Sequence, residues 1–194
     1  STATSVVFTD ETMPASATLI DVDANGDNGV VAWTEEAGNV MKVSTQIKGL
    51  KAQANPDSSN MFRSQKKIKS IDLTMLDAQN VTSMSYMFRD CRGLTTLNLS
   101  SLNTKNATDM SSMFYGCSGL TSLDLSPLDT RKVTNMKYMF DGCSGLTALD
   151  LSPLNTQKVT SMDSMFNGCR SLTTLDLSPL DTQNVTSMSG MFSN

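Results

Sequence analysis

The chain has 194 residues, of which 39% are hydrophobic and 18% are charged, so it carries enough apolar side chains for a core. Its formal net charge is −4 and its Lys and Arg residues are scattered, which leaves no basic footprint for DNA or RNA. No apolar run approaches the roughly 18 residues of a membrane span. Histidine is absent, which removes the commonest general base and metal ligand. We therefore expect no nucleic acid partner, no membrane span, no metal, no other cofactor and no enzymatic activity.

Residues 1–60 predict a short β-rich unit. Four β-branched or alternating runs, separated by turn-rich stretches, are typical of strands: Val6–Phe8, Thr18–Asp23, Gly29–Thr34 and Asn39–Gln46. The stretch Asn25–Gly29 is rich in Asn and Gly, which tolerate the positive φ of tight turns, and it predicts a hairpin between the second and third runs. Trp33, Val31 and Val43 are candidates for the core of this unit.

The same stretch has a second interpretation as a calcium loop. It fills the opening positions of a D-x-D-x-N-G pattern with Asp21, Asp23, Asn25, Gly26 and Asp27. The closing position, which should bring a bidentate Glu, is Ala32 instead. Because the closing ligand is missing, the sequence favours the hairpin over the calcium site.

From Met61 onward one sequence motif recurs at a constant interval of 26 residues. The interval is marked by the aromatic residues Phe62, Phe88, Phe114, Phe140, Phe166 and Phe192, each after a Met. It is marked again by Cys91, Cys117, Cys143 and Cys169. A fixed period of this length is typical of a solenoid, in which each repeat buries its apolar face against its neighbours.

Each repeat contains L-x-x-L-x-L, as at Leu94, with a slightly degenerate first copy from Ile68 to Leu73, and this pattern predicts a short strand with a buried and an exposed face. A turn follows, which contains Pro in the later repeats. Then Met110, Met113 and Phe114 lie at the i, i+3, i+4 spacing of a helical turn, with Thr108 as a candidate N-cap and Gly116 as the closing residue.

The predicted fold is therefore an α/β solenoid of 26-residue repeats, with a parallel sheet on one face and short helical segments on the other. Residues 61–194 form about five repeats, the last one truncated, and residues 1–60 form a β-rich N-terminal cap over the first apolar face. A chain that stops in mid-repeat leaves an apolar edge, so we expect a longer protein or a partner at that end.

The four cysteines recur with the repeat, so we expect buried thiols packed as small core residues. Neighbouring copies would lie close enough for a disulfide, and one or two bridges are the alternative. The Met pairs could bind soft copper, but Met at helical spacing beside Phe is more typical of core packing.

The phrase V-T-x-M-x-x-M-F-x-x-C-x-x-L-T-x-L-D-L-S resembles the BspA-like leucine-rich repeat family of bacterial surface proteins. The segments Val30–Trp33 and Asn55–Phe62 are similar to the entry of such arrays, and the resemblance covers about residues 30–194. It implies a right-handed solenoid, secretion or attachment to the cell surface, and adhesion to proteins of a host or a neighbouring cell. The family has no catalytic motif to transfer.

Outward positions of the predicted strands are the candidates for binding, because the inward positions are committed to the core. We call them the polar face, and they are Thr95, Asn98, Thr121, Asp124, Thr147, Asp150, Thr173 and Asp176. The alternative is that these polar side chains only keep the surface hydrated. The sequence thus favours a secreted or surface-bound adhesion module with a protein ligand. A structural spacer of a larger surface protein is second, and a carboxylate-based hydrolase is least favoured.

Overall fold

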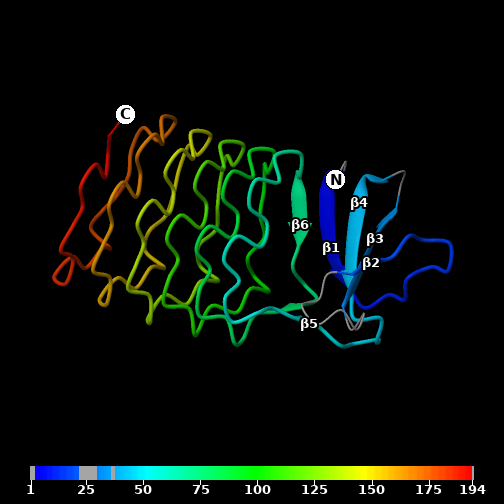
Figure 1. Ribbon diagram of the computed structural model, residues 1–194. Helices are drawn as coiled ribbons and strands as arrows, with labels where there is room; N and C mark the ends of the chain where they lie inside the picture. The colour runs from blue at the N-terminus through cyan, green and yellow to red at the C-terminus, as the bar shows by residue number, and fades with distance from the viewer. Residues whose placement is uncertain (1–2, 22–29, 36–37, 194) are drawn as a thin grey trace.

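The computed structural model describes residues 3–21, 30–35 and 38–193. Strands gather at the N-terminal end of the molecule, and a row of stacked coils leads from them to the C-terminus (Figure 1). Each coil is one 26-residue repeat, and successive coils lie side by side. In the part of the chain that the structure describes, no helix is both long and apolar enough to cross a bilayer.

A five-stranded sheet forms the N-terminal end. Its strands lie in the order β2 (Ile20–Asp21), β3 (Val31–Glu35), β4 (Val40–Ser44), β1 (Ser5–Thr9) and β6 (Ser70–Asp72). β3 pairs antiparallel with β2 and β4, whereas β1 pairs parallel with β4 and β6. The four strands predicted before residue 60 are confirmed with changed bounds: β1 extends one residue beyond the predicted run at each end, β3 ends one residue later, and β4 is shorter. Because β6 belongs to the first L-x-x-L-x-L copy, the N-terminal sheet continues into the repeats.

The predicted hairpin is confirmed in its strand pairing, since Ile20 lies opposite Ala32 and Asp21 opposite Val31. The turn itself, and the candidate calcium ligands from Asp23 to Asp27, lie outside the described residues.

The N-terminal sheet packs against the first coil. The Phe8 ring, from β1, meets the Phe62 ring edge-on at a centroid distance of 6.2 Å and an interplanar angle of 88°. Trp33, Val31 and Val43 are buried as expected, and the Trp33 indole donates a hydrogen bond to Glu35. A second parallel pair, β5 (Ala52–Gln53) with β7 (Leu76–Asp77), lies beside this junction. The junction also holds a mainly apolar cavity of about 750 Å³.

Backbone hydrogen bonds join the coils along the segment that contains Met-x-x-Met-Phe, here called the turn side. In the first full coil alternate amides donate to the next coil: Tyr86 to the Ser111 carbonyl at 3.0 Å, Phe88 to Met113 at 2.9 Å, and Asp90 to Tyr115 at 2.7 Å. The amides between them donate within the coil, three residues back: Met87 to Met84, Arg89 to Tyr86, and Cys91 to Phe88. Isolated parallel bridges continue this pairing from Asp57 to Ser187.

The prediction of short helical segments on the turn side is wrong, because residues 61–193 contain no α-helix. Two positions in each coil have positive φ, which a right-handed helix does not allow. The residues at the first position are Asn60, Tyr86, Ser112, Tyr138, Ser164 and Gly190, and those at the second are Ser64, Asp90, Gly116, Gly142 and Gly168. Up to Gly168, the amides of these positive-φ residues donate to the neighbouring coil, as at Tyr86 and Asp90, whereas the amide that follows each of them donates within its own coil. The Thr108 hydroxyl likewise donates to the Thr82 carbonyl of the preceding coil, at 3.2 Å, and caps no helix.

The L-x-x-L-x-L segments, here called the leucine side, are joined differently. Only the first copy, in β6, has the predicted parallel strand pairing; the later copies are extended but form no strands in residues 78–193. Among these later copies, the Thr147 amide donates to the Thr121 carbonyl at 3.3 Å. Packing of Leu side chains, more than a backbone ladder, holds this side together: Leu97, Leu123 and Leu149 are each less than 10% exposed.

An aromatic stack runs through all the coils; its rings are buried from Phe62 to Phe166, whereas Phe192 in the last coil is exposed. The rings from Phe62 to Phe192 stack in order at centroid distances of 5.4–5.8 Å, with their planes within 11° of parallel. Offset stacking of this kind is favourable beyond the area that it buries. The Met pairs of the middle coils are buried, as the repeat predicted, whereas Met188 of the last pair is exposed.

All four cysteines are free thiols, as expected, although Cys169 is only partly buried. Each thiol donates to the carbonyl of a Phe 29 residues earlier, such as Cys117 to Phe88 at 3.0 Å. Burial raises the pKa of Cys91 and of Cys169 to about 11. The thiols therefore act as polar core groups that connect one coil to the previous one.

Candidate binding surface

All eight residues of the polar face are exposed. They form two columns along the leucine side, one of threonines and one of Asn98 followed by three aspartates. The leucines between the columns point inward and are buried in the middle coils. The structure therefore brings the predicted candidates together on one continuous surface.

The acidic column has a local structural role that the sequence analysis did not identify. Asp124 accepts a hydrogen bond from the Ser126 amide at 2.9 Å, and this bond is the main reason that the pKa of Asp124 lies below its ordinary value. Such a bond to the amide two residues later stabilises a turn. Asn98 accepts the same bond from Ser100, also at 2.9 Å. The side-chain oxygen of Asn98 thus accepts the turn bond at the same distance as the carboxylate of Asp124, so this turn does not require a negative charge.

The threonine column makes few contacts of its own. The Thr147 hydroxyl donates to the Thr121 carbonyl of the preceding coil at 3.3 Å, beside the amide bond between the same residues.

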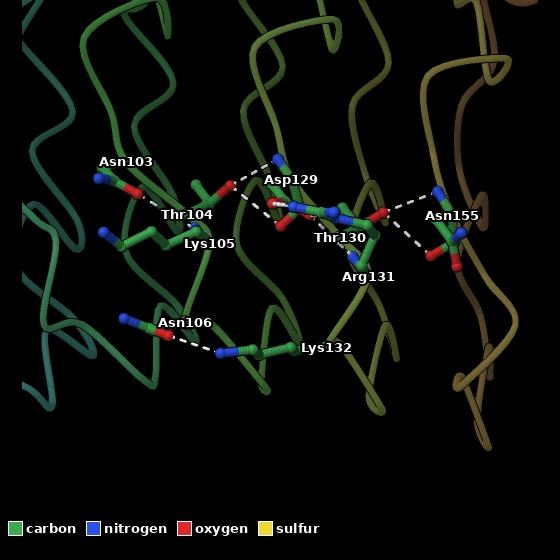
Figure 2. Close-up of polar contacts among 9 residues, drawn as sticks. All are labelled: Asn103, Thr104, Lys105, Asn106, Asp129, Thr130, Arg131, Lys132 and Asn155. Atoms are coloured by element: carbon green, nitrogen blue, oxygen red, sulfur yellow. Dashed lines mark hydrogen bonds and ion pairs between the residues drawn. The ribbon is translucent and has the colours of Figure 1, made fainter.

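A second set of threonines, which the sequence analysis passed over, joins the coils at the corner between the two sides. Figure 2 shows Thr130, whose hydroxyl donates to the Asn155 carbonyl at 3.0 Å and accepts from the Asn155 amide at 2.8 Å. Thr104 makes the same double contact with Asp129. These threonines are only 2% exposed. Their signal in the sequence was the Asp/Asn-Thr pair that recurs in every repeat after the first, where Ala78 takes the place of the threonine.

The corner also carries cations. The Arg131 guanidinium forms two hydrogen bonds with the Asp129 carboxylate, at 2.9 and 2.6 Å, and holds the pKa of Asp129 at about 2. The Lys132 ammonium donates to the Asn106 side-chain oxygen of the preceding coil at 2.7 Å (Figure 2). Lys105 and Lys158 are exposed on the same corner. The corner thus carries charges of both signs, because Asp77, Asp129 and Asp181 lie there with the four cations, whereas the polar face beside it is acidic.

The polar face presents rows of exposed hydroxyl and carboxylate groups, which suits hydrogen bonding and ion pairing with a partner. In the described residues no group of three or more His, Cys, Asp or Glu side chains is arranged to hold a metal ion.

Two overlapping matches to one family model, over residues 35–143 and 117–194, cover most of the chain. The family is described as "Mycoplasma protein of unknown function, DUF285". Neither the curated proteins nor the solved structures include a match. The matched residues take in β4, all the coils and the whole polar face, so this chain belongs to the DUF285 family.

Proposed function

We propose that this chain is a non-catalytic binding module of a bacterial secreted or surface protein, which attaches to proteins of a host or of a neighbouring cell through its polar face. The stack of coils would be a right-handed leucine-rich repeat solenoid of the BspA-like kind. The family match is to a repeat-bearing family and is compatible with this proposal. The resemblance of the repeat phrase to BspA-like proteins is what suggests adhesion and an extracellular location.

The observation that carries the proposal is the uniform exposure of the eight polar-face residues over buried leucines. The aspartates add a second argument, because Asn98 makes the same turn without a charge. Like charges one coil apart repel each other weakly when solvated. A basic partner surface would relieve that repulsion. Contacts repeated over several coils would raise the overall affinity through avidity.

The proposal can be tested by immobilising the chain and measuring its binding to extracellular-matrix and serum proteins. In the test variant, Asp124, Asp150 and Asp176 are all changed to Asn, which removes three charges and keeps the turn bonds, as Asn98 does. The matched control changes Asp77, Asp129 and Asp181 to Asn. Those residues accept the same kind of turn bond at the corner, where Asn103 and Asn155 occur naturally.

We expect the test variant to lose at least about 10-fold in affinity for a bound protein and the control to lose much less, because interface charge pairs contribute more than solvated ones. Equal binding by both variants would exclude the polar face as the site. If no protein binds the chain above background while a longer form of the protein binds well, the repeats are a spacer.

A further inference from the structure

On the turn side, the outward-facing residues of the first coils differ from those at the same repeat positions in later coils, whereas the inward-facing Met and Phe residues are the same. Met and Phe recur in every coil, but the position of Arg63 and Arg89 is held by Tyr115, Asp141 and Asn167 in the coils that follow. The position of Lys66 and Arg92 is held by serine in the next two coils, at Ser118 and Ser144, and by arginine again at Arg170. Because packing does not require these outer side chains, the joint presence of cations at both positions in the first two coils indicates a local role.

Four of these side chains form a row along the stack. The Arg63 and Arg89 guanidinium carbons lie 5.7 and 5.2 Å from the centre of the Tyr86 ring, and the Arg89 guanidinium also lies 4.4 Å from the centre of the Tyr115 ring. Contacts between a guanidinium and an aromatic ring at such distances are attractive. The row thus alternates Arg63, Tyr86, Arg89 and Tyr115, and it holds two guanidinium groups one coil apart.

Further cations flank this row. A methyl group added at Gly93 would lie 2.7 Å from the Lys66 carbonyl oxygen, which places the backbone of Lys66 and Lys67 directly beside that of Arg92 and Gly93. Arg63, Lys66, Lys67 and Arg92 are exposed, whereas Arg89 is partly buried. We call these five cations, with Tyr86 and Tyr115, the arginine patch.

The positive charge of the arginine patch is only partly neutralised. Asp90 forms ion pairs with Arg89 at 3.4 Å and with Arg92 at 3.1 Å. Within the described ranges, no Asp or Glu side chain forms an ion pair with Arg63, Lys66 or Lys67. A chain with a net charge of −4 thus concentrates a third of its 15 Lys and Arg residues on this one surface. The row stops at Asp141, which is buried and accepts a hydrogen bond from Asn167.

We propose that the arginine patch binds an acidic polysaccharide, one that carries carboxylate or sulfate groups at regular intervals. Planar guanidinium groups bind such anions through paired hydrogen bonds, and rings that stack on them keep their orientation fixed. Two guanidinium groups spaced by one coil match a regularly charged chain better than a single anion. Single-stranded nucleic acid is disfavoured, because guanidinium groups already contact the tyrosine rings on which bases would stack.

This site is separate from the polar face, both in position and in the sign of its charge. The chain would therefore bind two partners of different chemistry, and the test below does not depend on the proposed protein adhesion.

The experiment measures the affinity of the intact chain for heparin, as a sulfated probe, and for polygalacturonate, as a carboxylated probe, at low ionic strength. The test variants are Arg63→Gln with Arg89→Gln, and Arg89→Lys alone. The second variant keeps the charge but loses the planar fork. The matched control is Lys105→Gln with Lys132→Gln, which removes the same charge from the corner. Circular dichroism and thermal melting establish that each variant is folded.

We expect the intact chain to bind at least one of the two polysaccharides and the double arginine variant to lose at least about 10-fold in affinity, because hydrogen bonds to charged groups are the strong ones. Arg89→Lys should weaken binding measurably, whereas the corner control and the polar-face triple variant should keep it. Failure of the intact chain to bind either polysaccharide would overturn the proposal. So would equal losses in the arginine variant and the corner control, or tighter binding of poly-glutamate or of an oligonucleotide.

Discussion

The two sides of each coil keep the same 26-residue interval by different physical means. On the turn side, alternate amides donate to the next coil, and the Phe rings stack beneath them. On the leucine side, the later segments have almost no backbone bonds between coils and depend on buried leucines and on turn bonds to Asp or Asn. The turn side therefore fixes the spacing of the stack, and the leucine side follows it.

This difference bears on where binding surfaces can evolve. Few outward side chains of the leucine side make bonds between coils, so the residues of the polar face can be substituted without loss of such bonds. On the turn side the backbone is constrained, but outward side chains such as Arg89 differ between coils without disturbing the bonds beneath them. Both proposed binding surfaces use side chains that the stack does not require.

The largest expected effect comes from removing one ring of the aromatic stack. Phe114→Ala should destabilise the protein by about 3–5 kcal/mol, because the ring is fully buried and loses two stacked neighbours. Leu123→Ala, on the leucine side, should cost about 2–3 kcal/mol, because the side chain is smaller and stacks on nothing. Urea denaturation followed by circular dichroism measures both. If Leu123→Ala cost as much as Phe114→Ala, the two sides would not differ as described.

Glycine substitutions separate two reasons for small residues in the coil. At Gly119, an added methyl group would lie 2.5 Å from the Arg92 carbonyl oxygen of the preceding coil, so the coils would have to move apart. We expect Gly119→Ala to cost about 2–3 kcal/mol. Gly142 has room for a methyl group, but its φ is +71°, so Gly142→Ala should cost about 1–2 kcal/mol from backbone strain alone.

Thermal melting of the two glycine variants ranks these costs. A larger loss for Gly142→Ala than for Gly119→Ala would mean that backbone conformation, and not the close approach of the coils, limits this part of the repeat.

The corner threonines offer a milder test of how the two sides are joined. Thr130→Val keeps the shape of the side chain but removes the hydroxyl that both donates to Asn155 and accepts from it. We expect a loss of about 1–3 kcal/mol, because the partly buried amide and carbonyl of Asn155 are left without partners. Thr134→Val, in which an exposed hydroxyl donates to Thr108, is the control and should cost less than about 1 kcal/mol. Equal losses would show that the corner threonines contribute no special connection.

The smallest expected effect is a dependence of stability on pH. Asp163 accepts hydrogen bonds from Ser187, Ser161 and the Ser189 amide and forms an ion pair with Lys137, which together lower its pKa from 3.8 to about 2. A carboxyl whose pKa falls on folding stabilises the protein above its unfolded pKa. That stability is lost as the pH falls from about 4 toward 2.

We expect Asp163→Asn to remove this part of the acid sensitivity, by about 1 kcal/mol or less since the ion pair lies near the surface. Melting temperatures of the wild type and the variant at pH 5 and pH 2.5 provide the measurement. An unchanged difference between the two pH values would contradict the assignment to Asp163.

Much of the arrangement could be predicted from the sequence, because the fixed interval alone requires equivalent residues to lie in columns. The interval predicted that the recurring Phe and Met residues lie in the core, that the thiols are buried and that the polar face points outward. The N-terminal hairpin pairing followed from a run of turn-forming residues between two β-branched segments. These features depend on residue type and spacing, which the sequence states directly.

The helical segments were predicted wrongly for a physical reason. Met110, Met113 and Phe114 have the spacing of one helical face, but a chain of tight turns that bond three residues back places the same residues inward. What distinguishes the two is a positive φ at Ser112, and serine gives no sign of that conformation. The corner threonines escaped notice because a buried Thr hydroxyl needs a partner in another repeat, which only the stacked structure supplies.

The continuous stack of Phe rings from Phe62 to Phe192 also determines which insertions and deletions the protein can tolerate. Removing or adding 26 residues, or a multiple of 26, would place every Phe ring and every thiol beside an equivalent neighbour. The ring stacking and the thiol hydrogen bonds between coils would then be restored. Any other insertion within the coils would place a ring where its neighbour has a polar group. The length of the stack should therefore change by whole repeats, and such a change needs no new side-chain contacts in the core.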